Sequence, residues 1–166
     1  MTDYKNLKLI ATSNPHIRSN DTTRSIMLDV IIAMLPALIW SVVEFGVRAL
    51  AVTLVSVAGS VFFEWLYRNL LKKPQSVGDL SAVVTGMLLS FVCPVNVAYW
   101  QILIGDAFAI IMVKQLFGGI GKNFLNPALA GRAFMLASFA STMSGNWIDP
   151  AVSKAGIASP ADIVTA

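Results

Sequence analysis

Two asparagines, Asn123 and Asn126, lie three residues apart in a glycine-rich stretch, residues 118–134, that reads GGIGKNFLNPALAGRAF. If a helix begins there, the two side chains are neighbours on its surface, and each offers two donors and one acceptor. Such a pair can bind the carbonyls and ring nitrogens of a flat heterocycle. Alternatively, Asn126 only caps a helix that starts at Pro127, while the glycines allow a tight turn. The sequence pattern leaves both interpretations open.

Two acids, Asp79 and Asp106, interrupt otherwise apolar stretches. Ionisable side chains inside membrane segments are costly and often mark ion paths, so both acids could help to conduct a sodium ion or a proton. They could equally cap a helix or pair with neighbouring helices. The single cysteine, Cys93, excludes an intrachain disulfide and a metal site built from this chain's cysteines alone. No metal site is therefore predicted.

The composition indicates the kind of element that must position these side chains. Of 166 residues, 56% are hydrophobic and 13% are charged, and the mean hydropathy is +0.70. These values predict a membrane protein. The net charge of +3 does not indicate nucleic-acid binding, because the cations lie between apolar runs. The polar residues 1–20 contain no apolar core, so no cleavable signal peptide is predicted.

The apolar runs predict an all-α, polytopic fold with about five transmembrane helices, since about 20 apolar residues cross a bilayer. Polar and small residues interrupt the third run, which predicts a helix packed inside the protein or facing a cavity. Lys114, near the end of the fourth run, is expected to extend to the cytoplasmic surface. The runs cover about residues 26–43, 49–67, 77–93, 100–117 and 133–143.

Lysine and arginine alternate between loops, which sets the expected orientation. Residues 1–24 and the loops around 68–73 and 114–132 hold nearly all the cations. The positive-inside rule then places the N-terminus and residues 118–134 at the cytoplasmic face. The predicted domains are a cytoplasmic arm (1–24), a transmembrane helical repeat (25–143) and an extracytoplasmic segment (144–166).

Three motifs carry a resemblance to a known family: SNPHIR at residues 13–18, Gly78-Asp79, and above all the long motif at residues 118–134. They resemble the RnfD protein of the Rnf ion-translocating ferredoxin:NAD oxidoreductase and the related NqrB protein of the sodium-pumping NADH:quinone reductase, the RnfD/NqrB family. The resemblance covers nearly the whole chain. It implies about ten helices in two inverted five-helix repeats, similar to urea transporters, of which this chain supplies the first.

The resemblance also implies a covalent flavin. Family members carry FMN through a phosphoester on a threonine in a motif resembling Asp-x-x-Ser/Thr-Gly/Ala-Ala-Thr. Asp162 and Thr165 fall on the first and fourth positions of that motif, whose first five positions match Asp162-Ile163-Val164-Thr165-Ala166. The acceptor threonine would lie two residues beyond Ala166, so Asp162 and Thr165 are expected only to flank it.

A second, non-covalent flavin, riboflavin, is implied for the membrane part. The paired asparagines of the loop are its expected contacts, which assigns Asn123, Asn126 and the adjoining Pro127. Gly121 and Lys122 complete the expected riboflavin site.

The resemblance implies a flavin-carrying membrane subunit that relays electrons between ferredoxin and NAD and couples them to Na+ or H+ translocation. The chain would act as an enzyme only within this translocase, beside the other Rnf complex subunits (A, B, C, E, G) and membrane lipid, with no nucleic acid. The expected location is the bacterial or archaeal cell (inner) membrane, crossed several times. The alternative is half of a solute channel or secondary transporter without a redox role, since a broken loop at the membrane is also typical of these proteins.

Overall fold

The computed structural model describes residues 21–145 and 147, and every regular element among them is helical. The all-α prediction is therefore confirmed for this part of the chain. Most of the predicted arm and of the segment from residue 144 onward lies outside the described residues. The elements are α1 Thr23–Phe45, α2 Val47–Leu70, the 3-10 helix η2 Val77–Asp79, α3 Ser81–Val92, α4 Tyr99–Ala107, the π-helix η3 Phe108–Gln115, α5 Pro127–Ser138 and α6 Ala140–Gly145.

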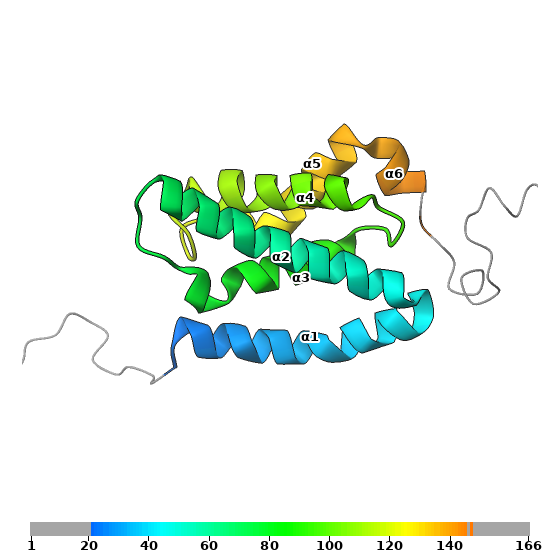
Figure 1. Ribbon diagram of the computed structural model, residues 1–166, viewed down its shortest axis with the longest axis horizontal. Helices are drawn as coiled ribbons and strands as arrows, with labels where there is room; N and C mark the ends of the chain where they lie inside the picture. Colours follow the sequence, from blue (N-terminus) through cyan, green and yellow to red (C-terminus); the bar gives the residue numbers. More distant parts are fainter. Residues whose placement is uncertain (1–20, 146, 148–166) are drawn as a thin grey trace, which may run out of the picture.

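The helices lie side by side, and the chain runs back and forth between the two ends of the bundle (Figure 1). Helices α2 and α3 form the middle layer, with α1 on one side and α4 and α5 on the other. Helix α1 begins where the Thr22 hydroxyl accepts a hydrogen bond from the Ser25 amide at 3.2 Å. It ends at Gly46, whose φ of 75° permits the tight reversal into α2.

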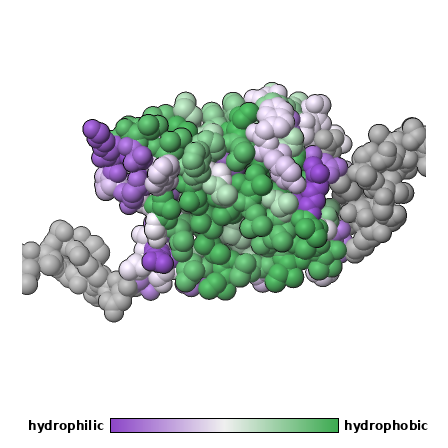
Figure 2. Space-filling view, in the orientation of Figure 1, coloured by the Kyte–Doolittle hydropathy of each residue, from purple (hydrophilic) through white to green (hydrophobic). Residues whose placement is uncertain are grey.

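Two helices, α1 and α2, are long and apolar enough to cross a membrane, with 23 and 24 residues. Helix α1 has no buried residue, and it exposes Ile39, Trp40 and Val43 by more than half of their surface. Apolar side chains cover the middle of the face in Figure 2, while hydrophilic side chains gather toward the two ends of the helices. This distribution is typical of a chain surrounded by lipid.

Each of the five predicted runs contains a helix, but the predicted starts of the third and fifth are wrong, and the fifth run is divided at Phe139 between α5 and α6. The third helix begins at Ser81 rather than at residue 77, because a 3-10 turn precedes it. The fifth begins at Pro127 rather than at residue 133, because an asparagine cap and a proline start it before the apolar run. That five segments span the membrane stays a prediction.

Helix α3 is packed inside the bundle, as its small and polar residues predicted, and most of its residues are buried. Gly86 marks its closest approach to α2. A Cβ atom at this position would lie 2.8 Å from the Ser56 carbonyl oxygen and 2.8 Å from the Val57 Cα. Glycine thus allows the two backbones to touch, as is common between membrane helices.

Lys114 does not extend to the surface, so that prediction is wrong. Its side chain is 3% exposed, and its Nζ lies 2.8 Å from Oε2 of Glu64, a residue of α2 with no exposed surface. The ammonium group also donates to the Ser81 hydroxyl at 2.5 Å. A buried counter-charge and a hydroxyl thus replace the water that an extended lysine would have reached.

Three further side chains surround the Glu64 carboxylate. Gln115 Nε2 donates to Glu64 Oε1 at 2.8 Å, and the Ser76 hydroxyl donates to the same oxygen. Arg68 Nε lies 4.0 Å from it. Because the residues come from α2, η3 and the α2–α3 connection, the carboxylate links three segments at one end of the bundle.

Replacing Gly86 by alanine should destabilise the protein by about 1–3 kcal/mol, because the new Cβ would meet α2 backbone that cannot move aside. The measurement is thermal unfolding of the full-length protein in detergent. The matched control is Gly78→Ala, where an added Cβ meets nothing within 4 Å. Equal melting temperatures of the two variants would contradict this account of the α2–α3 contact.

Replacing Lys114 by methionine should cost about 3–5 kcal/mol, because it leaves the Glu64 carboxylate buried without its main counter-charge. The double variant Glu64→Gln with Lys114→Met should lose less than the single variant Lys114→Met, since no isolated charge remains. Thermal unfolding in detergent measures the stability of both variants. The control is Lys72→Met, which changes an exposed lysine. A double variant that is less stable than Lys114→Met would rule out charge pairing as the cause.

Candidate functional site

The loop between η3 and α5 reverses the chain at three glycines. The backbone φ values of Gly118, Gly119 and Gly121 are 103°, 94° and 79°. Residues other than glycine rarely adopt such positive values. The Gly119 amide donates to the Lys114 carbonyl at 2.9 Å, and the Lys122 amide donates to the Gly119 carbonyl at 3.2 Å. The predicted tight turn is therefore present and is attached to the end of η3.

Asn126 caps α5, in agreement with one of the two interpretations of the asparagine pair. Its Oδ1 accepts a hydrogen bond from the Ala128 amide at 3.0 Å, and Pro127 occupies the first turn. Asn126 itself is exposed. Since the cap uses the side-chain oxygen, the amide nitrogen remains as the group that could meet a ligand.

Asn123 differs from Asn126, because it does not cap the helix. Its Oδ1 is buried and has no hydrogen-bond partner among the described residues. A buried acceptor without a donor costs about 1–3 kcal/mol. An N–H group of a bound molecule would remove this cost, so Asn123 is the stronger candidate of the pair for a ligand contact.

Apolar side chains accompany the two asparagines. Phe117 and Phe124 meet edge to face with ring centroids 4.8 Å apart. Phe124 is 69% exposed, and Ile120 and Leu125 are exposed as well. Amide groups beside exposed aromatic and aliphatic surface suit a ligand with a flat ring and polar edges. Of the other expected contacts, Lys122 lies against Gly118, and a Cβ at Gly121 would meet nothing within 4 Å.

Asp106 lies in the middle of the bundle, with none of its surface exposed. Its Oδ1 accepts hydrogen bonds from the Ser56 and Ser60 hydroxyls of α2, both at 2.9 Å. Its Oδ2 is buried and has no hydrogen-bond partner in the part of the chain that the structure describes. Gly59 makes room for it, because a Cβ there would lie 3.1 Å from Oδ2.

Asp79 accepts two hydrogen bonds at the start of α3, although the cap residue of that helix is Leu80. The Asp79 Oδ1 accepts from the Ser81 amide at 2.9 Å and from the Ser81 hydroxyl at 2.5 Å. Through Ser81 it joins the Glu64–Lys114 pair. The structure therefore assigns Asp79 and Asp106 to separate clusters.

Sequence reasoning missed Ser56, Ser60 and Glu64, which are all fully buried on one face of α2. Their spacing of four residues within an apolar run was the available signal, since residues four apart share a helix face. The two residues predicted to flank the FMN motif, Asp162 and Thr165, lie outside the described residues.

Residues 10–166 match the family described as the NQR2, RnfD, RnfE family. The RnfD-type chain of the Na+-translocating ferredoxin:NAD+ oxidoreductase complex of Acetobacterium woodii is 48% identical over 160 residues, which cover 96% of this chain and 50% of the relative. Its counterpart in the proton-translocating ferredoxin:NAD+ oxidoreductase complex of Clostridium ljungdahlii is 35% identical, over 84% of this chain and 42% of its own length. The counterpart in an ion-translocating oxidoreductase complex of Actinobacillus succinogenes is 40% identical, over 84% of this chain and 39% of its own length.

The chain thus spans about half the length, or less, of these relatives. The resemblance expected from the loop motif is confirmed, because the match includes the motif and extends over nearly all of the 166 residues. With its apolar helices and this match, the chain is a membrane protein that belongs to the NQR2, RnfD, RnfE family.

Proposed function

We propose that this chain forms the first repeat of a flavin-carrying membrane subunit in an Rnf-type complex. The complex relays electrons between ferredoxin and NAD and couples them to Na+ or H+ translocation, with the other Rnf complex subunits (A, B, C, E, G) as partners. The observation that carries the proposal is the 48% identity, over 96% of this chain, to a protein named for ferredoxin:NAD+ oxidoreduction. A solute channel is disfavoured, because all three relatives are named as parts of oxidoreductase complexes.

The proposed topology has five spans in the cell membrane, with the N-terminus and the loop after η3 in the cytoplasm. The distribution of exposed cations supports it. Arg24, Lys72, Lys73 and Lys122 belong to segments that meet at the end of the bundle where α1 begins, whereas Arg48 belongs to the opposite end (Figure 1). Cations concentrate on the cytoplasmic side of membrane proteins.

The proposed cofactors are FMN and riboflavin. FMN is bound covalently to a threonine that follows Thr165, and riboflavin contacts the loop at Asn123, Asn126 and Pro127. The unpartnered Asn123 Oδ1 and the exposed aromatic surface beside it support the riboflavin site. When bound, the flavins supply the electron-transfer chemistry, while the protein sets their position and electrostatic surroundings.

Full-length protein that contains the complete threonine motif should carry flavin that survives denaturation. In-gel fluorescence after denaturing electrophoresis measures it, and replacement of the motif's last threonine by valine should abolish it. Absence of fluorescence in wild-type protein isolated from its native membrane would reject the redox function.

Replacing Asn123 by leucine should lower the non-covalent riboflavin content of the purified complex by about tenfold, because one hydrogen bond to the ring is lost. Extraction followed by chromatography measures riboflavin, and the covalent FMN content should not change. The matched control Asn126→Ser keeps the helix cap and should retain more riboflavin than Asn123→Leu. Equal riboflavin in wild type and Asn123→Leu would refute the assignment.

A further inference from the structure

We propose that Asp106, Ser56, Ser60 and the carbonyl of Gly86 bind one Na+ in the middle of the helix bundle. The proposal rests on the proposed function, because it gives the transported ion a binding site inside this chain. It concerns the cluster around Asp106, which is separate from both the flavin loop and the Glu64–Lys114 pair.

Four oxygens meet in this cluster. The Ser56 hydroxyl lies 2.9 Å from Asp106 Oδ1 and 2.9 Å from the Gly86 carbonyl oxygen, and the Ser60 hydroxyl lies 2.9 Å from the same Oδ1. The oxygens come from α2, α3 and α4, so the site is built by tertiary contacts. The close approach at Gly86 brings the α3 carbonyl within reach of α2.

The cluster contains too few hydrogens for its acceptors. A serine hydroxyl has one hydrogen, so Ser56 cannot donate fully to both Asp106 and Gly86. The second carboxylate oxygen, Oδ2, is buried without a partner among the described residues. A cation among the oxygens would supply the missing positive charge, because each hydroxyl could then direct a lone pair at the ion.

The charge of the cluster favours a monovalent ion. Asp106 is fully buried, and the serines and the carbonyl are neutral. An isolated carboxylate in the apolar interior costs several kcal/mol, and one positive charge cancels it. A divalent ion would leave a net positive charge buried instead.

The chemistry of the oxygens favours Na+ among monovalent ions. Carboxylate, hydroxyl and carbonyl oxygens bind hard cations, whereas soft metals prefer sulfur and nitrogen. The two serine hydroxyls lie 2.9 Å from Asp106 Oδ1, so an entering ion must push these oxygens apart, and a small ion separates them less than K+ does.

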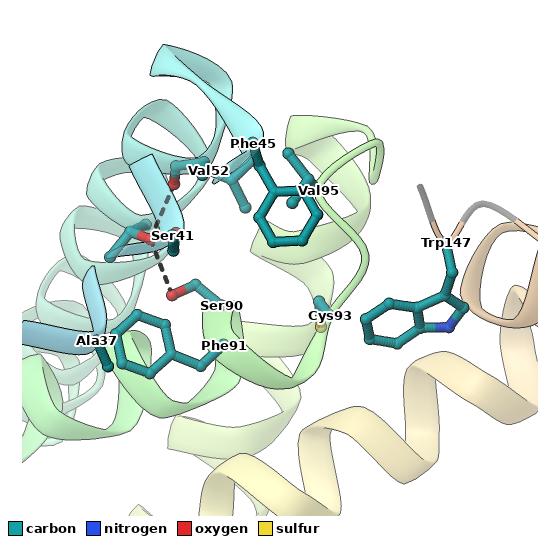
Figure 3. A pocket seen from close by; sticks show the side chains of 11 residues that line it. Ala37, Ser41, Phe45, Val52, Ser90, Phe91, Cys93, Val95 and Trp147 are labelled. Atoms are coloured by element: carbon teal, nitrogen blue, oxygen red, sulfur yellow. Dashed lines mark hydrogen bonds between the residues drawn. The ribbon is translucent and has the colours of Figure 1, made fainter. Parts of the chain in front are cut away.

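The site lies roughly 15 Å from each end of α2, at 1.5 Å per residue, which is half the thickness of a bilayer core. A cavity of about 270 Å³ is lined by residues of α1, α2 and α3 together with Cys93, Val95 and Trp147, and none of the four proposed ligands lines it (Figure 3). Thr53 and Ser90 line this cavity and are hydrogen-bonded to each other at 3.1 Å. Thr53 is one helical turn from Ser56, so the cavity begins about one turn of α2 from the site.

The test measures binding separately from activity. The purified complex containing the full-length chain is heated in detergent at constant ionic strength, with NaCl replaced stepwise by KCl. Na+, and its smaller congener Li+, should raise the melting temperature, because ligands that bind the folded state stabilise it. Ser60→Ala should raise the half-saturating Na+ concentration at least about tenfold, since it removes one ligand. Asp106→Asn should abolish the Na+ effect.

The matched control is Thr85→Val, which removes a buried hydroxyl that bonds only within α3, to the Ser81 carbonyl. It should leave the half-saturating Na+ concentration unchanged. If Ser60→Ala and Thr85→Val respond to Na+ alike, or if the wild-type complex shows no stabilisation by Na+ over K+, the site is refuted. Failure of the redox function would be distinguishable, because it would appear as missing flavin in wild type whatever the Na+ response.

Discussion

One face of α2 is polar although the helix lies in an apolar bundle, and the packing of the other helices depends on it. Ser56, Ser60 and Glu64 follow one another at every fourth residue, and none of them has exposed surface. Away from water, each of these groups must find a partner, because an unpaired buried polar group is costly. The partners come from α3, α4 and η3, so the pairing fixes how these elements pack against α2.

Two separate clusters of polar contacts lie along this face of α2. At one end, Glu64 and Lys114 cancel each other's charge and are supported by Gln115 and Ser81. In the middle, Asp106 has hydroxyl partners and one oxygen that lacks a partner among the described residues. Every charged group of the first cluster has a partner, whereas the second cluster leaves Asp106 Oδ2 without one among the described residues, which is why the ion site is proposed there. The π-helix between Asp106 and the loop carries Lys114 and Gln115, and such helices are frequent at functional sites.

The first residues of the loop after η3 contact the π-helix that carries Lys114, the partner of Glu64 on this polar face. The loop glycines fold back on the end of the π-helix, where the Gly119 amide meets the Lys114 carbonyl. The proposed ion site and the proposed flavin site therefore lie at the two ends of the π-helix η3. A shift of η3 would therefore move both proposed sites together.

Sequence reasoning was sufficient for the helical class, the membrane environment, the interior position of α3, the glycine turn and the Asn126 cap. These features follow from hydropathy, from small residues and from local hydrogen bonds, which act over a few residues along the chain. The helix packing was needed to show that Lys114 is buried beside Glu64 and that Asp106 meets Ser56 and Ser60. The spacing of apolar residues along the chain does not specify which side chain on another helix each of these residues contacts. The pairings across helices depend on where Gly59 and Gly86 let the helices approach each other.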